Sequence, residues 1–247
     1  MVFYGVNVEI NFTLTNWSAY VADRIEGDNQ HLLSTEQILD VSFLPPLKRR
    51  RLSNLSRMSL RLAHSIAPDY KGYCVFGSQH GELVTTQGLL ESIVQGEIVS
   101  PAGFSASVHN TAVGLHSINC KNTYPCTSIA AGIDTLPMCF AESFAILNSG
   151  EASEVLLVFA DDVVPDSLAG FVDGNEMRGF AALVKPGDET ADKKLRLRLL
   201  KQQSGGLPQE QKENNSVRSL VSLLENTEQR SIDMPGEDGR WRCQHSD

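Results

Sequence analysis

The alternation of apolar and polar positions predicts where the strands of this chain lie. Ile10–Trp17 alternates apolar and polar residues, which is typical of a half-buried strand. Largely apolar runs at Tyr73–Gly77, Glu154–Ala160 and Gly179–Lys185 predict short buried strands. Lys193–Lys201 alternates charged residues with leucine, which predicts an edge strand with one exposed face.

Apolar residues recur at helical spacing in the stretches between these strands. The predicted helices are a short start at Ser34–Gln37, then Leu47–Ile66, Gly81–Gln95, Ser105–Ser117, Ala130–Asn148 and Val217–Gln229. An extended run, Asn122–Ser128, precedes the Ala130 helix. Strands that alternate with helices of this length indicate βαβ units, so we predict an α/β fold with a largely parallel sheet.

The end of the chain differs in composition from the part before it. The polar stretch Ser204–Ser216 contains glycine and proline and is typical of a linker. At 247 residues the chain fits one domain with a tail, so we predict a domain over residues 1–203 and a linker, short helix and tail over 204–247. We expect Asp233–Asp247 to be irregular, with Trp241 docked on the domain.

Bulk composition excludes several classes of function. The net charge of −9 argues against binding nucleic acid, and no apolar run approaches the roughly 20 residues of a membrane-spanning helix. Five scattered cysteines, in a chain whose first residues lack signal-peptide features, indicate reduced thiols in the cytoplasm. The cysteines do not have zinc-site spacing and the glycines do not form a phosphate loop, so we predict neither a metal nor a cofactor.

The central stretch Ser100–Asp162 organises the candidate chemistry. Its long apolar helix opens on Ala130, Ala131 and Gly132, at the place where an acyl-transfer enzyme of this architecture would keep a nucleophile. Cys126 precedes that helix and Cys139 lies more than two turns inside it, so neither has the first-turn position that favours a thiolate. Buried structural thiols are therefore the favoured interpretation, with a nucleophilic role as the alternative.

Three other polar motifs each have a structural and a catalytic interpretation. Gly77–Gly81 resembles the turn of a hydrolase nucleophile elbow, but its middle residue is Gln79 rather than serine, which favours a tight turn. His109 could act as a general base, although a buried, hydrogen-bonded histidine is favoured. Asp161 and Asp162 could transfer protons, but carboxylates after a strand more often cap the following turn.

One basic cluster interrupts this acidic chain. It consists of Lys48, Arg49, Arg50 and Arg51. The cluster could dock an acidic partner or a phosphate group. A solvated helix start is the favoured interpretation, because a single run of charges is weak evidence for a site.

Four segments between roughly Leu47 and Asp162 together resemble a known family. They read LKRRRLSNLSRMSLRLA, VFGSQHGELVTTQGLLESI, SPAGFSASVHNTAVGLHSI and SIAAGIDTLPMCFAESFAILNSGEASEVLLVFADD. They resemble the N-terminal half of β-ketoacyl synthases, which have the thiolase fold. The likeness is closer to the short ketosynthase-like subunits called chain length factors, found in bacterial aryl polyene and related type II fatty acid or polyketide clusters.

The resemblance implies a fold and the loss of catalysis. It implies a thiolase-like half-domain, βαβαβαββ, with a mostly parallel mixed sheet covered by helices on both faces, plus a short C-terminal helix and tail. An active ketosynthase has a nucleophilic cysteine at the first turn of the helix that begins here near Ala130, where this chain has Ala130, Ala131 and Gly132. It also needs two histidines from a C-terminal half that we do not find in this sequence.

The resemblance also implies partners. A full-length β-ketoacyl synthase would supply the cysteine and both histidines, and this chain would take the place of its second subunit and shape the acyl tunnel. The acyl chains would be held by acyl carrier protein, for which Lys48–Arg51 is a candidate docking site. The candidates for the interface and the tunnel wall are Phe104, His109, Asn110, His116, Tyr124, Met138 and Phe140.

Two alternatives remain open at this point. The chain could be a shortened thiolase-like acyltransferase or decarboxylase that uses Cys126 or Cys139. It could also be a docking module for acyl carrier protein. Whether it is an enzyme on its own is therefore uncertain from the sequence.

Overall fold

The computed structural model describes most of the chain. It covers residues 9–22, 29–172, 175–188, 196–203, 216–226, 228–237 and 239–246, and for 196–203 it describes the backbone alone. The strands are β1 (Glu9–Val21), β2 (Tyr73–Gly77), β3 (Cys126–Ile129), β4 (Val155–Asp161), β5 (Arg178–Pro186), β6 (Arg196–Gln203), β7 (Ser231–Gly236) and β8 (Gly239–His245). The α-helices are α1 (Thr35–Ile38), α2 (Pro46–Arg49), α3 (Asn54–Ile66), α4 (Leu83–Val94), α5 (Pro101–Ala106), α6 (Thr111–Cys120), α7 (Thr135–Asn148) and α9 (Ser216–Glu225). Short 3₁₀ turns are η1 (Gly132–Asp134) and η2 (Ala169–Phe171).

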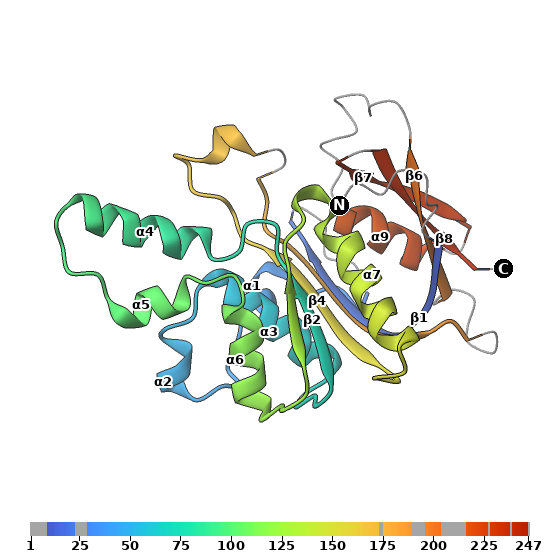
Figure 1. The fold of residues 1–247 in the computed structure, drawn as a ribbon, viewed down its shortest axis with the longest axis horizontal. Helices are drawn as coiled ribbons and strands as arrows, with labels where there is room; N and C mark the ends of the chain where they lie inside the picture. The colour runs from blue at the N-terminus through green and yellow to red at the C-terminus, as the bar shows by residue number, and fades with distance from the viewer. Residues whose placement is uncertain are drawn as a thin grey trace.

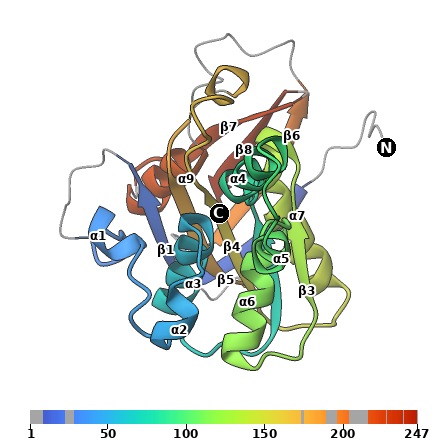
Figure 2. The same cartoon turned by 90° about the vertical axis from the view of Figure 1, so that its left-hand side faces the viewer.

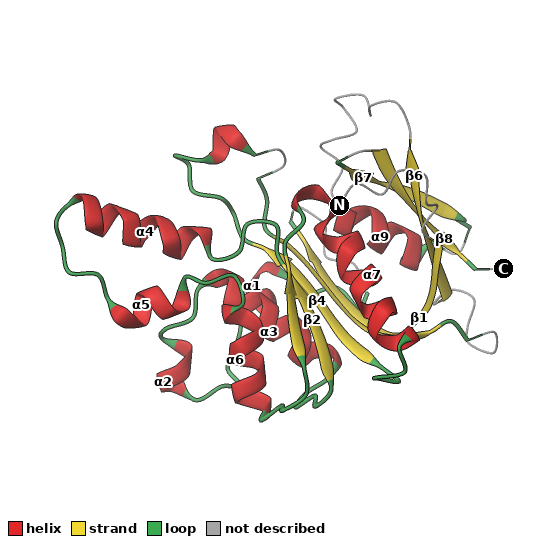
Figure 3. Cartoon of the chain, in the orientation of Figure 1, coloured by secondary structure: helices red, strands yellow, loops and turns green. Residues whose placement is uncertain are grey.

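The described strands form one mixed sheet (Figures 1 and 3). Their order in the sheet is β3-β2-β4-β5-β1-β6-β8-β7. β2 runs parallel to both β3 and β4, and every other neighbouring pair in this order is antiparallel. The predicted α/β class and the mixed sheet are therefore confirmed. The prediction that the sheet is mostly parallel is wrong, because β4 and β5 are joined by a loop without a crossover helix, which returns the chain antiparallel.

Helices cover both faces of the sheet, as expected. On one face Met58 and Leu62 of α3 pack with Phe76 and Val158, whose side chains point to that side. The alternate strand residues point the other way and pack against α7 and α9; Phe12 of β1 stacks on Phe140 of α7 with ring centroids 4.7 Å apart. Burial of these apolar faces supplies the main driving force for the fold.

The C-terminal segment continues the sheet. β7 and β8 form a hairpin, and β8 pairs with β6, which itself pairs with β1. Two predictions are therefore wrong: the Lys193–Lys201 strand is an interior strand over its described part, and residues 233–246 are largely strand rather than irregular. Alternating apolar positions such as Met234, Trp241 and Cys243 fill the core beneath the hairpin. The predicted linker lies almost wholly outside the described residues, at 204–215.

Two predicted helices are each divided in the structure. Leu47–Ile66 is split into α2 and α3 because the Ser53 hydroxyl accepts a 3.0 Å hydrogen bond from the Ser56 amide and so caps a new helix start. Ser105–Ser117 is split into α5 and α6, with His109 in the turn between them. The predicted Ala130 helix likewise begins later, since η1 precedes α7.

Helices α4 and α5 form an arm that extends away from the sheet (Figures 1 and 2). No residue from 83 to 106 is buried, although the arm carries several large apolar side chains. Val94, Ile98 and Phe104 are 87%, 96% and 64% exposed. An apolar arm of this kind is a feature of binding surfaces.

No helix among the described residues is long and apolar enough to cross a bilayer.

Candidate functional site at the start of helix α7

Several loops meet at one edge of the sheet. Because β2, β3 and β4 are parallel, the residues at their carboxyl ends, Ser78 after β2, Ala130 after β3 and Asp161 at the end of β4, lie at the same edge. β5 runs antiparallel to β4 and begins at this edge with Arg178, which pairs with Asp161 in the strand register. This edge is where an α/β sheet normally carries its chemistry.

A buried carboxylate, Asp161, ties this edge together. Its Oδ1 accepts hydrogen bonds from the Ser78 hydroxyl at 2.9 Å and the Gln79 amide at 2.7 Å. Its Oδ2 forms an ion pair with Arg178 Nη2 at 3.0 Å, and Arg178 Nη2 also donates to Gln79 Oε1 at 2.9 Å. Ser78 Oγ in turn accepts from the Gly81 amide at 2.9 Å, so the predicted tight turn is present. This network holds the β2 and β4 ends in place.

The position of the expected nucleophile carries small, unreactive side chains. Ala130, Ala131 and Gly132 follow β3, and Gly132 has a positive φ of 54° that favours glycine. Thr135, the first residue of α7, donates to the Gly132 carbonyl at 2.6 Å and accepts from the Ala131 amide at 3.0 Å. The Thr135 hydroxyl therefore uses its donor and an acceptor position in hydrogen bonds to backbone groups of the turn.

A carboxylate lies at the N-terminus of α7. Asp134 is the residue directly before the helix, and its Oδ1 accepts a 2.6 Å hydrogen bond from Trp241 Nε1 of β8. Its Oδ2 accepts from the Glu237 amide at 3.3 Å. A negative charge at this end of a helix is stabilised by the helix dipole. The same charge opposes formation of a second anion, such as a thiolate, at the same place.

Two of the predicted histidines have structural partners near this edge. His109 is half-buried, and its ring nitrogens contact Ser128 Oγ at 3.1 Å and the Ser78 carbonyl oxygen at 2.8 Å. His116 is buried against Phe76, and burial lowers its pKa to about 4. His116 Nδ1 contacts Cys120 Sγ at 3.8 Å, but burial lowers the pKa of the histidine and raises the pKa of the thiol, so this pair does not favour a thiolate.

The two cysteines considered as nucleophiles differ in exposure. Cys139 is fully buried, packs beside Gly77, and has its pKa raised by burial. Cys126 is half-buried on β3, where hydrogen bonds from Cys74, Ser117 and Asn122 lower its pKa to about 6. A role for Cys139 as an accessible nucleophile is therefore inconsistent with the structure.

The side chains expected at an interface fall into two groups. Phe104, Asn110, Tyr124 and Met138 are exposed. Phe140 and His116 are only 1% and 3% exposed, so they belong to the core rather than to a surface of this chain.

The basic cluster lies on α2 and the turn that follows it. Lys48, Arg50 and Arg51 are exposed, and Lys48 Nζ donates to Asn119 Oδ1 at 2.6 Å. Arg57 donates to the Arg49 carbonyl at 2.7 Å and so fixes the turn. Three of the four cations therefore face solvent, as both interpretations of the cluster require.

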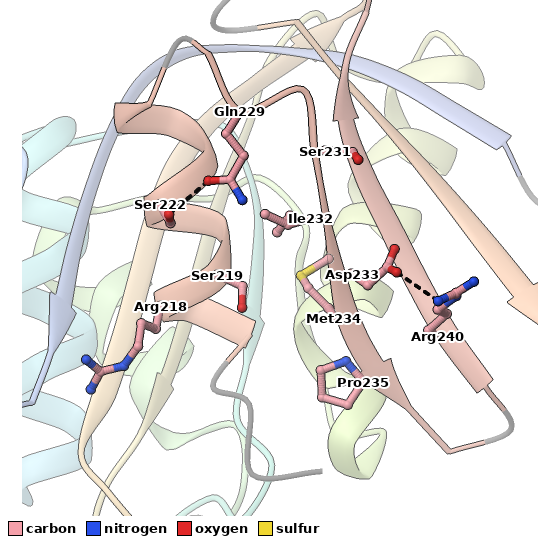
Figure 4. A pocket seen from close by; sticks show the side chains of 10 residues that line it. All are labelled: Arg218, Ser219, Ser222, Gln229, Ser231, Ile232, Asp233, Met234, Pro235 and Arg240. Atoms are coloured by element: carbon pink, nitrogen blue, oxygen red, sulfur yellow. Dashed lines mark hydrogen bonds and ion pairs between the residues drawn. The ribbon is translucent and has the colours of Figure 1, made fainter. Parts of the chain in front are cut away.

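A separate pocket of about 440 Å³ lies between α9 and β7 (Figure 4). Ser222 donates to Gln229 at 3.0 Å across its upper part, and Arg240 pairs with Asp233 at 3.0 Å on the hairpin. Its described lining consists of Arg218, Ser219, Ser222, Gln229, Ser231, Ile232, Asp233, Met234, Pro235 and Arg240. That set contains no cysteine or histidine that could act as a nucleophile or a general base. Within the described residues no group of histidine, cysteine and carboxylate side chains could hold a metal ion.

Sequence reasoning missed the two interactions that define this edge. The Asp134–Trp241 contact joins residues 107 positions apart, and no local pattern indicates it. The Asp161–Arg178 pair had a signal: a charged residue ends one buried strand and another begins the next, so an antiparallel pairing would bring them together.

Comparison with known proteins places the chain in a family. The model of the β-ketoacyl synthase N-terminal domain matches residues 19–244. The chain therefore belongs to this family, and the resemblance seen in the sequence is confirmed. A direct search of curated proteins gave no match.

Solved structures with the same fold include two that contain chain length factors. One is a ketosynthase (ApeO) in complex with its chain length factor (ApeC) from Xenorhabdus doucetiae, with a TM-score of 0.76 and 23% identity over 96% of this chain and 100% of that one. Another is the ishigamide ketosynthase/chain length factor, with a TM-score of 0.50 and 17% identity over 60% of this chain. The match covers 47% of that second, longer chain. At these identities the likeness establishes the thiolase-like fold.

Proposed function

We propose that this chain is a non-catalytic ketosynthase-like subunit, a chain length factor, that pairs with a full-length β-ketoacyl synthase and shapes its acyl tunnel. The observation that carries the proposal is the start of α7. Ala130, Ala131 and Gly132 offer no nucleophile, and Asp134 places a carboxylate where a thiolate would need positive potential. The reacting cysteine would therefore come from the partner.

The arm and the sheet edge support pairing with a second protein. Residues 83–106 expose apolar side chains that a separate chain would cover on binding. β3 is the last of the described strands at its end of the sheet and has a backbone edge that can pair with another strand. The proposed interface comprises the exposed Phe104, Asn110, Tyr124 and Met138, together with the half-buried His109. The known complex of ApeO with ApeC is a precedent for such a pair.

The substrate and pathway follow from the same proposal. Acyl chains carried by acyl carrier protein would enter the partner's active site, in aryl polyene-type fatty acid or polyketide biosynthesis. The exposed cations Lys48, Arg50 and Arg51 would contact the acidic carrier protein. A cytoplasmic location remains a prediction.

Co-expression tests the pairing. A tagged copy of this chain is expressed with a candidate full-length β-ketoacyl synthase from the same organism, and the purified material is analysed by size exclusion. The proposal predicts a stable 1:1 complex, and separate elution of the two proteins at micromolar concentration would contradict it. Arg50→Ala with Arg51→Ala is expected to weaken carrier binding while leaving the 1:1 complex intact.

One observation favours a second candidate, an acyltransferase or decarboxylase that uses Cys126. Its pKa of about 6 gives it thiolate character at neutral pH. However, Cys126 lies within β3 rather than at a helix start, and no histidine among the described residues is paired with it. Turnover of acyl and malonyl thioesters by the isolated chain, abolished by Cys126→Ser, would establish this candidate and overturn the first.

A further inference from the structure

Two cysteines occupy directly opposed positions on neighbouring strands. Cys74 of β2 and Cys126 of β3 are register partners in the parallel pair. Side chains at paired positions of a parallel sheet project to the same face, and adjacent strands lie about 4.8 Å apart. A disulfide requires a Cα separation of roughly 4.4–6.8 Å, so the backbone already satisfies this condition.

A shared hydrogen-bond donor holds the two sulfur atoms together. Asn122 Nδ2 donates to Cys74 Sγ and to Cys126 Sγ, each at 3.5 Å, and to the Gly72 carbonyl at 2.9 Å. Asn122 itself is buried, so its amide is fixed by these contacts. Both thiols therefore face one small polar space beneath α6, where Ser117 Oγ lies 3.3 Å from Cys126 Sγ.

The two thiols differ in a way that assigns each a role. Cys126 is half-buried and its pKa is lowered to about 6, first by the hydrogen bond that Cys74 donates and then by those from Ser117 and Asn122. Cys74 is buried, and the same shared hydrogen bond together with burial raises its pKa well above the usual value. Cys126 is thus the thiol that ionises first and meets solvent, while Cys74 remains protonated behind it.

The remaining cysteines do not share these properties. Burial raises the pKa of Cys120, Cys139 and Cys243. Cys139 and Cys243 are also inaccessible in the core. Among the five cysteines of the chain, all of which are described and free, Cys126 stands apart as the reactive thiolate.

We propose that Cys126 and Cys74 form a redox-active dithiol that small-molecule disulfides, such as glutathione disulfide, convert to an intrachain disulfide. The Cys126 thiolate attacks one sulfur of the small disulfide, whose S–S bond breaks and releases one thiolate. Cys74 then loses its proton and attacks the Cys126 sulfur of the mixed disulfide, which releases the second small thiol. The protein loses two protons and two electrons, and glutathione disulfide takes them up to give two molecules of glutathione.

The bond would join the strand at the end of the sheet to its neighbour. Among the described strands β3 is hydrogen-bonded to β2 alone, so its attachment depends on few backbone bonds. A covalent link at Cys126 would hold this edge in register. The inference concerns the isolated chain and does not depend on the proposed ketosynthase partner.

Oxidation of the full-length chain under graded ratios of glutathione disulfide to glutathione tests this site. Peptide mass spectrometry with fragmentation identifies the linked sulfurs, and we expect a Cys74–Cys126 disulfide as the main product. In brief labelling with glutathione disulfide at pH 7, Cys126 should react at least about tenfold faster than any other thiol, because thiolate fraction and exposure set the rate. A main product linking Cys126 to Cys120, or no intrachain disulfide at all, would overturn the proposal.

Matched variants separate the two roles. Cys74→Ser is expected to leave Cys126 as a stable mixed disulfide with glutathione, because no second thiol resolves it. Cys126→Ser should leave Cys74 reduced under the same conditions, and Cys120→Ser should change neither product nor rate. Equal accumulation of the Cys126 mixed disulfide in the wild-type chain and in Cys74→Ser would contradict a resolving role for Cys74, and circular dichroism of each variant confirms that it is folded.

Discussion

Trp241 Nε1 donates a 2.6 Å hydrogen bond to Oδ1 of Asp134, and so joins the C-terminal hairpin to the first turn of helix α7. Both side chains are largely buried. Gly236 lies against the same pair, where a β-carbon would come within 2.6 Å of Asp134 Oδ1. The hairpin therefore packs against Asp134 at the start of α7, whereas Ala130 and Gly132 just before it are exposed.

Replacing Trp241 by phenylalanine should destabilise the fold. Phe keeps most of the apolar surface but removes the N–H donor to a buried carboxylate, and a hydrogen bond to a charged group is worth about 1.5–3 kcal/mol. Urea unfolding should therefore give a free energy lower by about 2 kcal/mol. An unchanged unfolding midpoint would show that the contact does not stabilise the hairpin.

A double-mutant cycle with Asp134→Ala isolates the pair, because alanine has no acceptor for the Trp241 N–H. If Trp241 and Asp134 interact as described, the two substitutions together should cost less than the sum of the separate costs. Strict additivity would mean that Trp241→Phe acts through packing alone.

The buried pair Asp161–Arg178 should be sensitive to loss of its cation. Arg178→Met leaves Asp161 buried without its ion-pair partner, which typically costs about 3–5 kcal/mol. The matched control is Lys185→Met, which removes one member of the more exposed pair Lys185–Glu154 and should cost less than about 1 kcal/mol. Similar unfolding free energies for the two variants would refute the role given to the buried network.

The free energy of unfolding should fall as the pH is lowered from 6.5 to about 4, because His116 titrates differently in the folded and unfolded chain. Burial lowers the pKa of His116 from 6.5 to about 4. Between these values the unfolded chain binds a proton that the folded chain does not, so acidification favours unfolding, by up to about 3 kcal/mol from this residue. Above pH 6.5 the residue is neutral in both states and adds no slope.

His116→Gln tests the assignment of that slope. The variant should lose a large part of the decline in stability between pH 6.5 and 4, and keep the part from His64 and His80, whose pKa values are also lowered by burial. Chemical unfolding of the variant and the wild type at several pH values measures the slope of the free energy of unfolding against pH. Identical slopes for the variant and the wild type would assign the pH dependence elsewhere.

The exposed arm should carry partner binding. Phe104→Asp places a charge on an apolar surface that the proposed complex buries, and loss of a central aromatic contact costs about 2 kcal/mol, or roughly thirtyfold in Kd. Leu47→Asp is the matched control, because Leu47 is 79% exposed but lies on α2 rather than on the arm. If the two variants bind the ketosynthase equally well, the arm is not part of the interface.

Periodicity predicted the elements of the sheet's first half, because each is defined by its own buried face. The strands predicted at Tyr73–Gly77 and Glu154–Ala160 match β2 and β4 closely, whereas the helix predicted from Ala130 begins only at Thr135. The C-terminal hairpin was missed because its core positions are carried by Trp241, Cys243 and Met234, among many charged residues. The division of the predicted Leu47–Ile66 helix was missed because a single serine cap, at Ser53, outweighed a continuous apolar pattern.

The candidate site was predictable where it depended on residue type and not where it depended on tertiary contacts. The absence of a nucleophile at Ala130–Gly132 can be read from the sequence, and the structure locates these residues at the α7 start. Phe140 and Tyr124 were indistinguishable as surface candidates, since both are bulky residues near one stretch. The structure separates them: Phe140 stacks on Phe12, whereas Tyr124 is 54% exposed.

The most direct test of the account is a condensation assay with acyl and malonyl groups on acyl carrier protein. The isolated chain should give no product, and the complex with a full-length β-ketoacyl synthase should give product even when Cys126 and Cys139 of this chain are both serine. Product from the isolated chain, lost on replacing either of these cysteines, would contradict the claim that this subunit is non-catalytic.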